Sequence, residues 1–246
     1  MKETLGFLKN IEIVLVCPQG AGNIGSVARV MKNTGFDNLT LIDPVPYENN
    51  EGWSMACNAG EFLKSAKVVC TIEEAVKDAR YICGASRRRG KLRFPTLSLD
   101  EATVEVAKLA EKNKIVVLFG REDRGLLNEE VALCDMLFEI PTHEDYPSLN
   151  LSHAVFAFCH ALFTQTEVPS AGDYIDLAVK DDVKKMYIHL EQTLRGLGYG
   201  EDEKGGDYLL GVIMKNFKRL FGRTGLIEKE VNMLRGILAK IEENTK

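Results

Sequence analysis

The sequence predicts an α/β fold, with a mostly parallel sheet covered by helices on both faces, and a small all-helical extension after it. Short runs of aliphatic residues alternate with longer helical patterns, which is typical of this fold class. Several of the short runs are apolar without polar alternation, as in strands that are buried on both faces. Beyond about residue 178 only helical patterns remain, and these predict the extension.

The alternation places residues 1–166 in one domain. The expected strands lie at 11–17, 39–43, 67–70, 80–84, 114–119 and 136–140. The expected helices lie at 23–34, 51–64, 72–78, 98–111, 127–133 and 150–166. We expect Asn128 to cap the helix at 127–133, and Ser148 and Asn150 to lie at the start of the helix at 150–166, where backbone N–H groups are free.

Residues 167–177 are expected to form a linker, because this segment is rich in Pro, Ser, Gly and Asp and lacks hydrophobic periodicity. The extension, 178–246, carries helical patterns at about 178–197, 206–222 and 226–243. In the last of these, a single apolar stripe is expected to dock on the neighbouring helices. It consists of Ile227, Val231, Leu234, Leu238 and Ile241.

The composition is that of an ordinary globular protein, with 246 residues, 45% hydrophobic and 27% charged residues, and a net charge of −5. Six cysteines are scattered singly without a C-x-x-C pair, which favours a reducing compartment and gives no indication of a metal site. No run approaches the roughly 18 apolar residues that a membrane-spanning helix needs, and the first residues lack the apolar core of a secretion signal. We therefore expect a cytoplasmic protein.

Basic residues cluster locally although the net charge is negative. Arg87, Arg88, Arg89, Lys91 and Arg93 share one loop, and Lys215, Lys218, Arg219 and Arg223 lie near the C-terminus. Each cluster alone is most often solvated surface, but together they are candidates for binding phosphates.

The stretch IEIVLVCPQGAGNIGSVARV carries a G-x-G-x-x-G at Gly20, Gly22 and Gly25, and Asp43 ends the next expected strand. This spacing is that of a dinucleotide-binding turn, and it keeps an NAD-dependent oxidoreductase as an alternative. Pro18 weakens that interpretation, because it has no N–H to donate to a phosphate. A glycine-rich turn without a ligand remains the other possibility.

Three further segments follow expected strands or precede an expected helix: CGASRRRGKLRFP at 83–95, VVLFGREDRGLLNEEV at 116–131 and IPTHEDYPSLNLSHAVFAFCHALF at 140–163. Glycines at the end of a strand allow a ligand to approach the backbone closely. His153 and His160 lie seven residues apart on one helical face, and without a third ligand we interpret them as structural.

The segments NIGSVARVMKNTGF, LFGREDRGL and YPSLNLSHA, in this order, resemble the three motifs of the SpoU/TrmH-type RNA 2'-O-ribose methyltransferases of the SPOUT superfamily. HLEQTL, FKRLF and NMLRGILAKIE resemble the C-terminal extension of the TrmJ family of bacterial tRNA methyltransferases. The resemblance covers nearly the whole chain. It implies a C-terminal trefoil knot whose loops hold S-adenosylmethionine, and a homodimer that completes the active site.

The resemblance also implies site residues. The adenosine of S-adenosylmethionine would rest against Ala85, Ser86, Arg87, Gly120, Ile140, Pro147, Ser148 and Leu149. Glu122 and Asn150 would hold the shape of this pocket, and Asn23 and Ser148 would contribute polar groups to catalysis. Arg29 occupies the position of the catalytic arginine, either as general base or as a cation that stabilises the developing alkoxide.

The implied reaction is S-adenosylmethionine-dependent 2'-O-methylation of a tRNA ribose at nucleotide 32, C or U, of the anticodon loop. The tRNA would be bound by Arg88, Arg89, Lys91, Lys215, Lys218, Arg219 and Arg223. One alternative is methylation at another tRNA position or on rRNA. More distant alternatives are a non-catalytic RNA-binding module and the NAD-dependent oxidoreductase.

Overall fold

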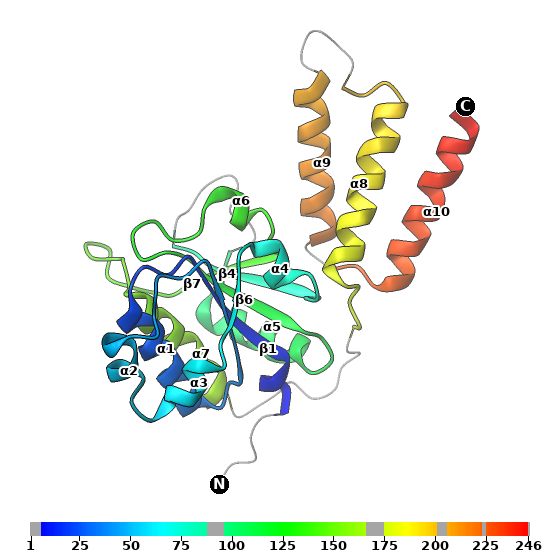
Figure 1. Cartoon of the computed structure of the whole chain (residues 1–246). Helices are drawn as coiled ribbons and strands as arrows, with labels where there is room; N and C mark the ends of the chain where they lie inside the picture. The colour runs from blue at the N-terminus through cyan, green and yellow to red at the C-terminus, as the bar shows by residue number, and fades with distance from the viewer. Residues whose placement is uncertain (1–5, 88–95, 166–174, 201–205, 223–224, 246) are drawn as a thin grey trace. The chain divides into compact units, whose positions relative to one another are not determined.

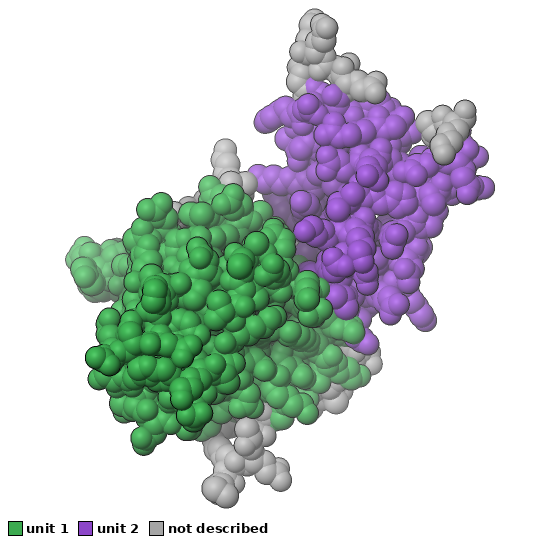
Figure 2. All heavy atoms as spheres, viewed as in Figure 1, with its two compact units in different colours: residues 1–175 green, residues 176–246 purple. Residues whose placement is uncertain are grey.

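The structure is a computed structural model that describes residues 6–87, 96–165, 175–200, 206–222 and 225–245. The chain divides into two compact units, Met1–Ile175 and Asp176–Lys246, which are drawn in green and purple in Figure 2. Each unit is described by itself.

The first unit is built on a seven-stranded sheet of order β3-β2-β1-β6-β4-β7-β5 (Figure 1). Every strand pair within the described residues is parallel. The strands are β1 (Ile11–Val16), β2 (Asn38–Ile42), β3 (Lys67–Val69), β4 (Tyr81–Ala85), β5 (Thr96–Ser98), β6 (Ile115–Phe119) and β7 (Met136–Glu139). The α/β fold expected from the sequence is confirmed.

Helices cover both faces of this sheet. They are α1 (Ala21–Thr34), α2 (Asn50–Ala56), α3 (Gly60–Lys64), α4 (Ile72–Val76), α5 (Leu99–Ala110), α6 (Asn128–Val131) and α7 (Leu151–Thr164). On one face, Val14 and Val116 of the sheet share a buried cluster with Val76 of α4 and with Val131 of α6. On the other face α1 packs against α7 and α2, and Ile24 of α1 is fully buried.

Two local expectations are wrong, and one strand was not expected. The helix expected at 51–64 is interrupted, because Cys57 adopts φ 50° and ends α2, and a 3-10 turn (Cys57–Ala59) leads into α3. Asn128 is the first residue of α6 and Leu127 is its N-cap. The sequence gives no signal for β5, whose three residues pair with β7 at the edge of the sheet.

The second unit consists of α8 (Lys180–Gly196), α9 (Gly206–Gly222) and α10 (Glu228–Thr245), drawn from yellow to red in Figure 1. α8 packs against both α10 and α9. Val231 of α10 is buried with Met186 of α8, and Leu238 is buried with Leu190, so the apolar stripe docks as expected. Within the residues that the structure describes, no helix combines the length and the hydropathy that a bilayer crossing requires.

Candidate active site

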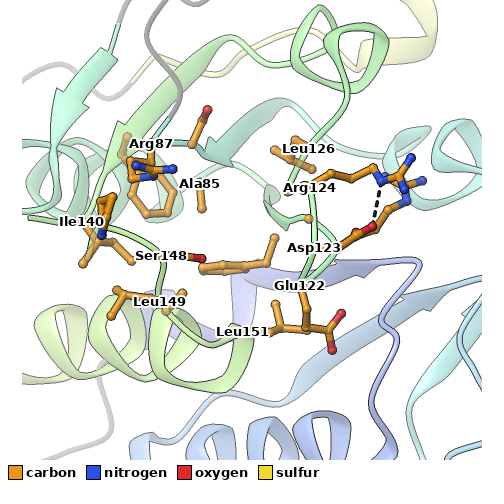
Figure 3. A pocket seen from close by; sticks show the side chains of 18 residues that line it. Ala85, Arg87, Glu122, Asp123, Arg124, Leu126, Ile140, Ser148, Leu149 and Leu151 are labelled. Carbon is orange, nitrogen blue, oxygen red and sulfur yellow. Dashed lines mark hydrogen bonds and ion pairs between the residues drawn. The ribbon is translucent and has the colours of Figure 1, made fainter. Parts of the chain in front are cut away.

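A cavity opens in the first unit where β4, β6 and β7 end (Figure 3). Its volume, counted with its open mouth, is about 870 Å³. The carboxyl ends of parallel strands meet at one edge of a sheet, which is where open α/β folds bind ligands. Ala85, Gly120 and Ile140 lie at or just after these three strand ends and line the cavity.

The cavity brings together segments that are far apart in the sequence. Of the residues expected to contact the methyl donor, Ala85, Ser86, Arg87, Gly120, Glu122, Ile140, Pro147, Ser148 and Leu149 line it. Figure 3 shows Ala85, Arg87, Ile140 and Leu149 on one side and Leu126 and Arg124 on the other. The lining also includes Phe119, Arg121, Asp123, Arg124, Gly125, Leu126, Phe138, Leu151 and Ala154, which sequence reasoning missed. These residues lie in the same segments as the expected ones. Their only signal in the sequence was that they are adjacent to residues expected to line the cavity.

The loop between β6 and α6 folds back on itself beside the cavity. The N–H of Gly125 donates to the carbonyl of Arg121 at 2.8 Å, and Gly125 adopts φ 61°, where glycine is favoured. A Cβ on Gly120 would lie 2.1 Å from the carbonyl carbon of Gly125. Glycine at position 120 is therefore required for the close approach of the two ends of this turn.

Buried aromatic rings lie directly behind the cavity. Phe119 and Phe138 line it, and both pack against Phe158 of α7, with ring centroids 6.0 Å and 5.1 Å away. All three side chains are fully or almost fully buried. The three rings therefore form an apolar support behind the cavity.

A series of hydrogen bonds joins the start of α1, the loop between β6 and α6, and the start of α7. The carboxylate of Glu122 accepts hydrogen bonds from the N–H groups of Gln19 and Gly20, at 2.9 and 3.1 Å, and from Asn23 Nδ2 at 2.8 Å. Asn23 Oδ1 in turn accepts from Asn150 Nδ2 at 2.8 Å. Asn150 caps α7, as expected, because its Oδ1 accepts from the N–H of Ser152. These amide and carboxylate groups fix the relative positions of the segments around the cavity.

The charged side chains of the loop lie partly at its exposed surface. Asp123 and Arg124 form an ion pair of 2.9 Å, and both side chains are exposed to solvent. The hydrogen bond from Arg124 lowers the pKa of Asp123. The carboxylate of Asp123 therefore stays ionised below its usual titration range.

Arg29 lies outside this cavity. Its side chain is exposed on α1, and Nη1 lies 3.3 Å from the sulfur of Cys57. It is not among the lining residues in the described part of the chain. The structure thus brings the cavity residues together with the hydrogen-bonded residues Glu122, Asn23 and Asn150. It does not place Arg29 in the cavity of its own polypeptide.

Two glycines of the G-x-G-x-x-G, Gly22 and Gly25, face α2. A Cβ on Gly25 would lie 2.1 Å from the carbonyl oxygen of Gly52, and one on Gly22 would lie 2.7 Å from Glu51 Oε1. Gly25 therefore lets the backbone of α1 approach α2 closely, whereas at position 22 only the flexible end of Glu51 would have to move. The packing of Gly25 needs no pyrophosphate, and Asp43 is an exposed residue just after β2.

The structure describes only some of the expected RNA-binding residues. Lys215, Lys218 and Arg219 are exposed on α9, and Lys218 Nζ lies 5.8 Å from the ring centroid of Tyr187. Arg88, Arg89, Lys91, Arg93 and Arg223 lie outside the described residues.

The two α7 histidines, His153 and His160, are exposed, and the ring of His160 lies 5.2 Å from that of Phe156. Among the residues with described positions, no three His, Cys, Asp or Glu side chains are grouped as a metal site would require.

Comparison with known proteins identifies the family. Residues 10–160 match the model of the SpoU rRNA Methylase family, and residues 181–246 match that of the tRNA methyltransferase TrmJ, C-terminal domain. The tRNA (cytidine/uridine-2'-O-)-methyltransferase TrmJ of Escherichia coli (strain K12) is 34% identical over 245 residues, which cover 97% of this chain and 98% of that protein.

Solved structures share the fold. The crystal structure of TrmJ from Z. mobilis ZM4 superposes with a TM-score of 0.78 at 28% identity, over 94% of this chain and 98% of that one. The SpoU methyltransferase AviRb from Streptomyces viridochromogenes, solved in complex with AdoMet, gives a TM-score of 0.50 at 19% identity, over 62% of this chain and 58% of that one. The oxidoreductase alternative is therefore wrong, and the chain belongs to the SpoU methylase family and, within it, to the TrmJ group of tRNA 2'-O-methyltransferases.

Proposed function

We propose that this enzyme transfers the methyl group of S-adenosylmethionine to the 2'-hydroxyl of nucleotide 32, C or U, in the anticodon loop of tRNA. The observation that carries the proposal is the cavity at the ends of β4, β6 and β7, which the motif-bearing loops line together.

The residues present fit this methyl donor. Ile140 and Leu149 line the cavity with partly exposed side chains and offer apolar surface to a planar ring such as adenine. The backbone around Ala85 and Ser148 offers polar groups that a ring nitrogen or a ribose hydroxyl needs. When bound, the donor supplies an electrophilic methyl group on a sulfonium, and AviRb has been solved with this donor.

The chain has to make a ribose hydroxyl nucleophilic. Arg29 serves this step in one of two ways: it removes the proton, with help from a substrate phosphate, or it stays charged and stabilises the developing alkoxide. A guanidinium has a pKa above about 12, so the first way demands an unusual environment. Ser148 lines the cavity and supplies a second polar contact, and Asn23 orients the segment that carries Arg29.

A second copy of the chain would complete the active site. Arg29 lies outside the cavity of its own chain, and α7, which packs against α1, exposes Phe156 and Phe163 to 48% and 42%. Phenylalanines exposed on one helical face are a typical feature of a surface that becomes buried on association. The homodimer would therefore form through the outer faces of α1 and α7.

The tRNA would engage basic residues in both units. Lys215, Lys218 and Arg219 share one helix and leave their charges in solvent, as phosphate contacts require. The enzyme would act in the cytoplasm, where unmodified tRNA is present. Methylation of another tRNA position or of rRNA is the alternative, because the cavity binds the methyl donor and carries no information about the nucleotide.

The test is methylation of unmodified tRNA with a radiolabelled methyl donor, followed by mass-spectrometric mapping of the methylated ribose. We expect label in the 2'-O-methyl group of nucleotide 32. Label at another nucleotide, or transfer to rRNA alone, would favour the alternative substrate. Absence of transfer at saturating donor and tRNA would overturn the proposed activity.

A further inference from the structure

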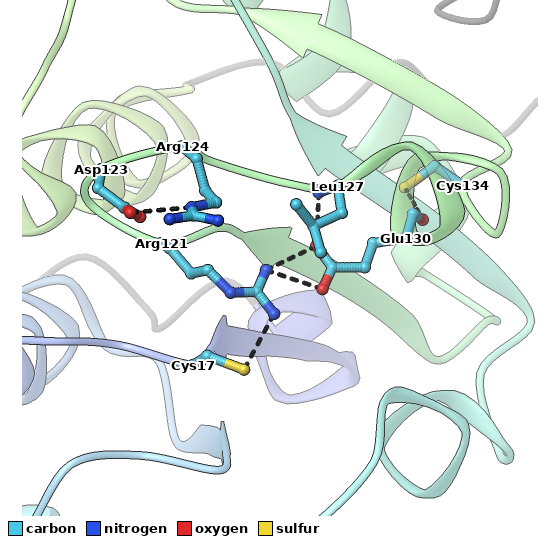
Figure 4. A network of polar contacts seen from close by, with 7 residues as sticks. All are labelled: Cys17, Arg121, Asp123, Arg124, Leu127, Glu130 and Cys134. Carbon is cyan, nitrogen blue, oxygen red and sulfur yellow. Dashed lines mark hydrogen bonds and ion pairs between the residues drawn. The ribbon is translucent and has the colours of Figure 1, made fainter.

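Arg121 and Glu130 form an ion pair beneath the loop that lines the cavity (Figure 4). Arg121 Nη1 donates to both carboxylate oxygens of Glu130, at 2.9 and 3.1 Å. The two side chains are only 16% and 8% exposed. A buried charge that loses its partner is strongly disfavoured, so the two groups hold each other in place.

The pair reaches two further segments. Glu130 Oε2 accepts from the N–H of Leu127 at 2.7 Å, and Arg121 Nη2 lies 3.1 Å from the sulfur of Cys17, just after β1. Burial alone would lower the pKa of Arg121, but the hydrogen bond and charge of Glu130 outweigh it and raise the pKa. The guanidinium is therefore a permanent charge that links β1, the loop and α6.

The loop has few internal means of keeping its shape. It has glycine at positions 120 and 125, and the Asp123–Arg124 ion pair is exposed, where such pairs contribute little. The hydrogen bond from Gly125 to Arg121 closes the turn directly above the buried pair. A contact that fixes Arg121 also fixes the carbonyl to which Gly125 donates.

We propose that the Arg121–Glu130 ion pair is a positioning clamp, which holds the 120–127 loop in the shape that receives the methyl donor. The inference rests on the proposed function for the identity of the ligand. Glu130 is not a lining residue of the cavity, so it acts through Arg121 and Leu127. Sequence patterns alone do not reveal the clamp, because the two residues belong to a turn and to the following helix.

A second ion pair with a buried carboxylate provides a control, and its Lys114 partner is 40% exposed. Glu12 of β1 is 6% exposed, and its Oε2 lies 2.8 Å from Lys114 Nζ, next to the start of β6. This pair joins the same two central strands, but at the ends opposite to those that lead into the cavity. If the Arg121–Glu130 pair contributed only to general stability, loss of either buried carboxylate would have a similar effect on exchange at Gly125 and on ligand binding.

The experiment compares Glu130→Gln with Glu12→Gln in the full chain, with Arg121→Gln as a second clamp variant. Hydrogen exchange at the Gly125 amide reports the shape of the loop without any ligand. Calorimetry measures the Kd for S-adenosylhomocysteine. In both clamp variants we expect Gly125 to exchange at least about tenfold faster and the Kd to rise about 10- to 100-fold, because small misplacements of binding groups are costly.

Glu12→Gln should leave both quantities within about twofold of the wild type, since it disturbs the opposite end of the sheet. Unchanged exchange at Gly125 in Glu130→Gln would overturn the clamp, as would faster exchange with an unchanged Kd. A wild-type protein that binds no S-adenosylhomocysteine would instead contradict the proposed function and the ligand part of this inference. Gly125 exchange would then still decide whether the pair holds the loop.

Discussion

Arg29 is the residue on which the proposed chemistry depends most directly. It is exposed, and its guanidinium touches Cys57 rather than any cavity residue. We predict that Arg29→Ala lowers kcat roughly 10²- to 10⁴-fold, because either general-base or electrostatic help is lost. The Kd for S-adenosylhomocysteine should stay within about twofold, since α1 does not need this side chain for packing.

Single-turnover methylation and calorimetry check this prediction together. Lys32→Ala is the matched control, because Lys32 is another exposed basic residue on α1, and its Nζ donates to the carbonyl of Asn58, next to Cys57. Its kcat should resemble that of the wild type. Methylation by Arg29→Ala at the wild-type rate would remove this residue from the mechanism under either of its two roles.

At the scale of elements, the loop between β6 and α6 sets the shape of the cavity. We predict that Gly120→Ala abolishes binding of S-adenosylhomocysteine and lowers the free energy of unfolding by about 1–3 kcal/mol. The added Cβ would meet backbone, 2.1 Å from Gly125 and 2.2 Å from Leu126, and backbone atoms cannot swing aside as a flexible side chain can.

Gly60→Ala provides the control within the same unit. Gly60 begins α3 with helical φ and ψ, and its Cβ would have an ordinary contact of 3.6 Å with Trp53. This variant should raise the free energy of unfolding by about 0.4–1 kcal/mol, since it reduces the entropy of the unfolded chain. Urea unfolding measures both variants, and equal stability of the two would contradict the requirement for glycine at position 120.

α9 is the element on which part of the tRNA affinity should depend. We predict that replacing Lys215 by Ala weakens tRNA binding and makes the slope of log K against log salt shallower by about 0.7–0.9, the value for one lost phosphate contact. Lys229→Ala, at an exposed position of α10, should leave the slope unchanged. Filter binding at several salt concentrations distinguishes the two, and an unaltered slope in Lys215→Ala would exclude that contact.

Sequence patterns predicted the elements whose side chains carry a periodic signal. In α1, Ile24, Val27 and Met31 recur at helical spacing, and all three are fully buried. β5 carries no such signal, because three residues suffice for backbone pairing with β7 and only one of their side chains is partly buried. The break at Cys57 was missed for a related reason, since the residues around it have the composition of a helix.

In the site, too, some features could be predicted from the sequence and others could not. The resemblance to a known family grouped Ala85, Gly120 and Ser148 correctly around one cavity, because motifs preserve the residues that follow strand ends. The link from Glu122 through Asn23 to Asn150 joins residues that are 99 and 127 positions apart, and its geometry exists only in the folded chain. The location of Arg29 outside its own cavity is likewise a property of the folded chain.

At the scale of the whole molecule, the separation of Arg29 from the cavity has a consequence for assembly. If the active site combines one chain's cavity with the other chain's Arg29, two inactive variants can complement each other. Leu149→Arg is a suitable partner variant, because Leu149 lines the cavity and is 39% exposed, so the longer side chain has room. Its positive charge would repel a sulfonium.

We predict that Arg29→Ala and Leu149→Arg are each inactive alone, and that their co-expression restores about a quarter of the wild-type activity. Random pairing makes half of the dimers mixed, and each mixed dimer has one site with both an intact cavity and an intact arginine. Mixed dimers purified through two different tags should show about half of the wild-type rate per dimer. If mixed dimers form and remain inactive, Arg29 acts on the cavity of its own chain, and α1 must then move toward that cavity when tRNA binds.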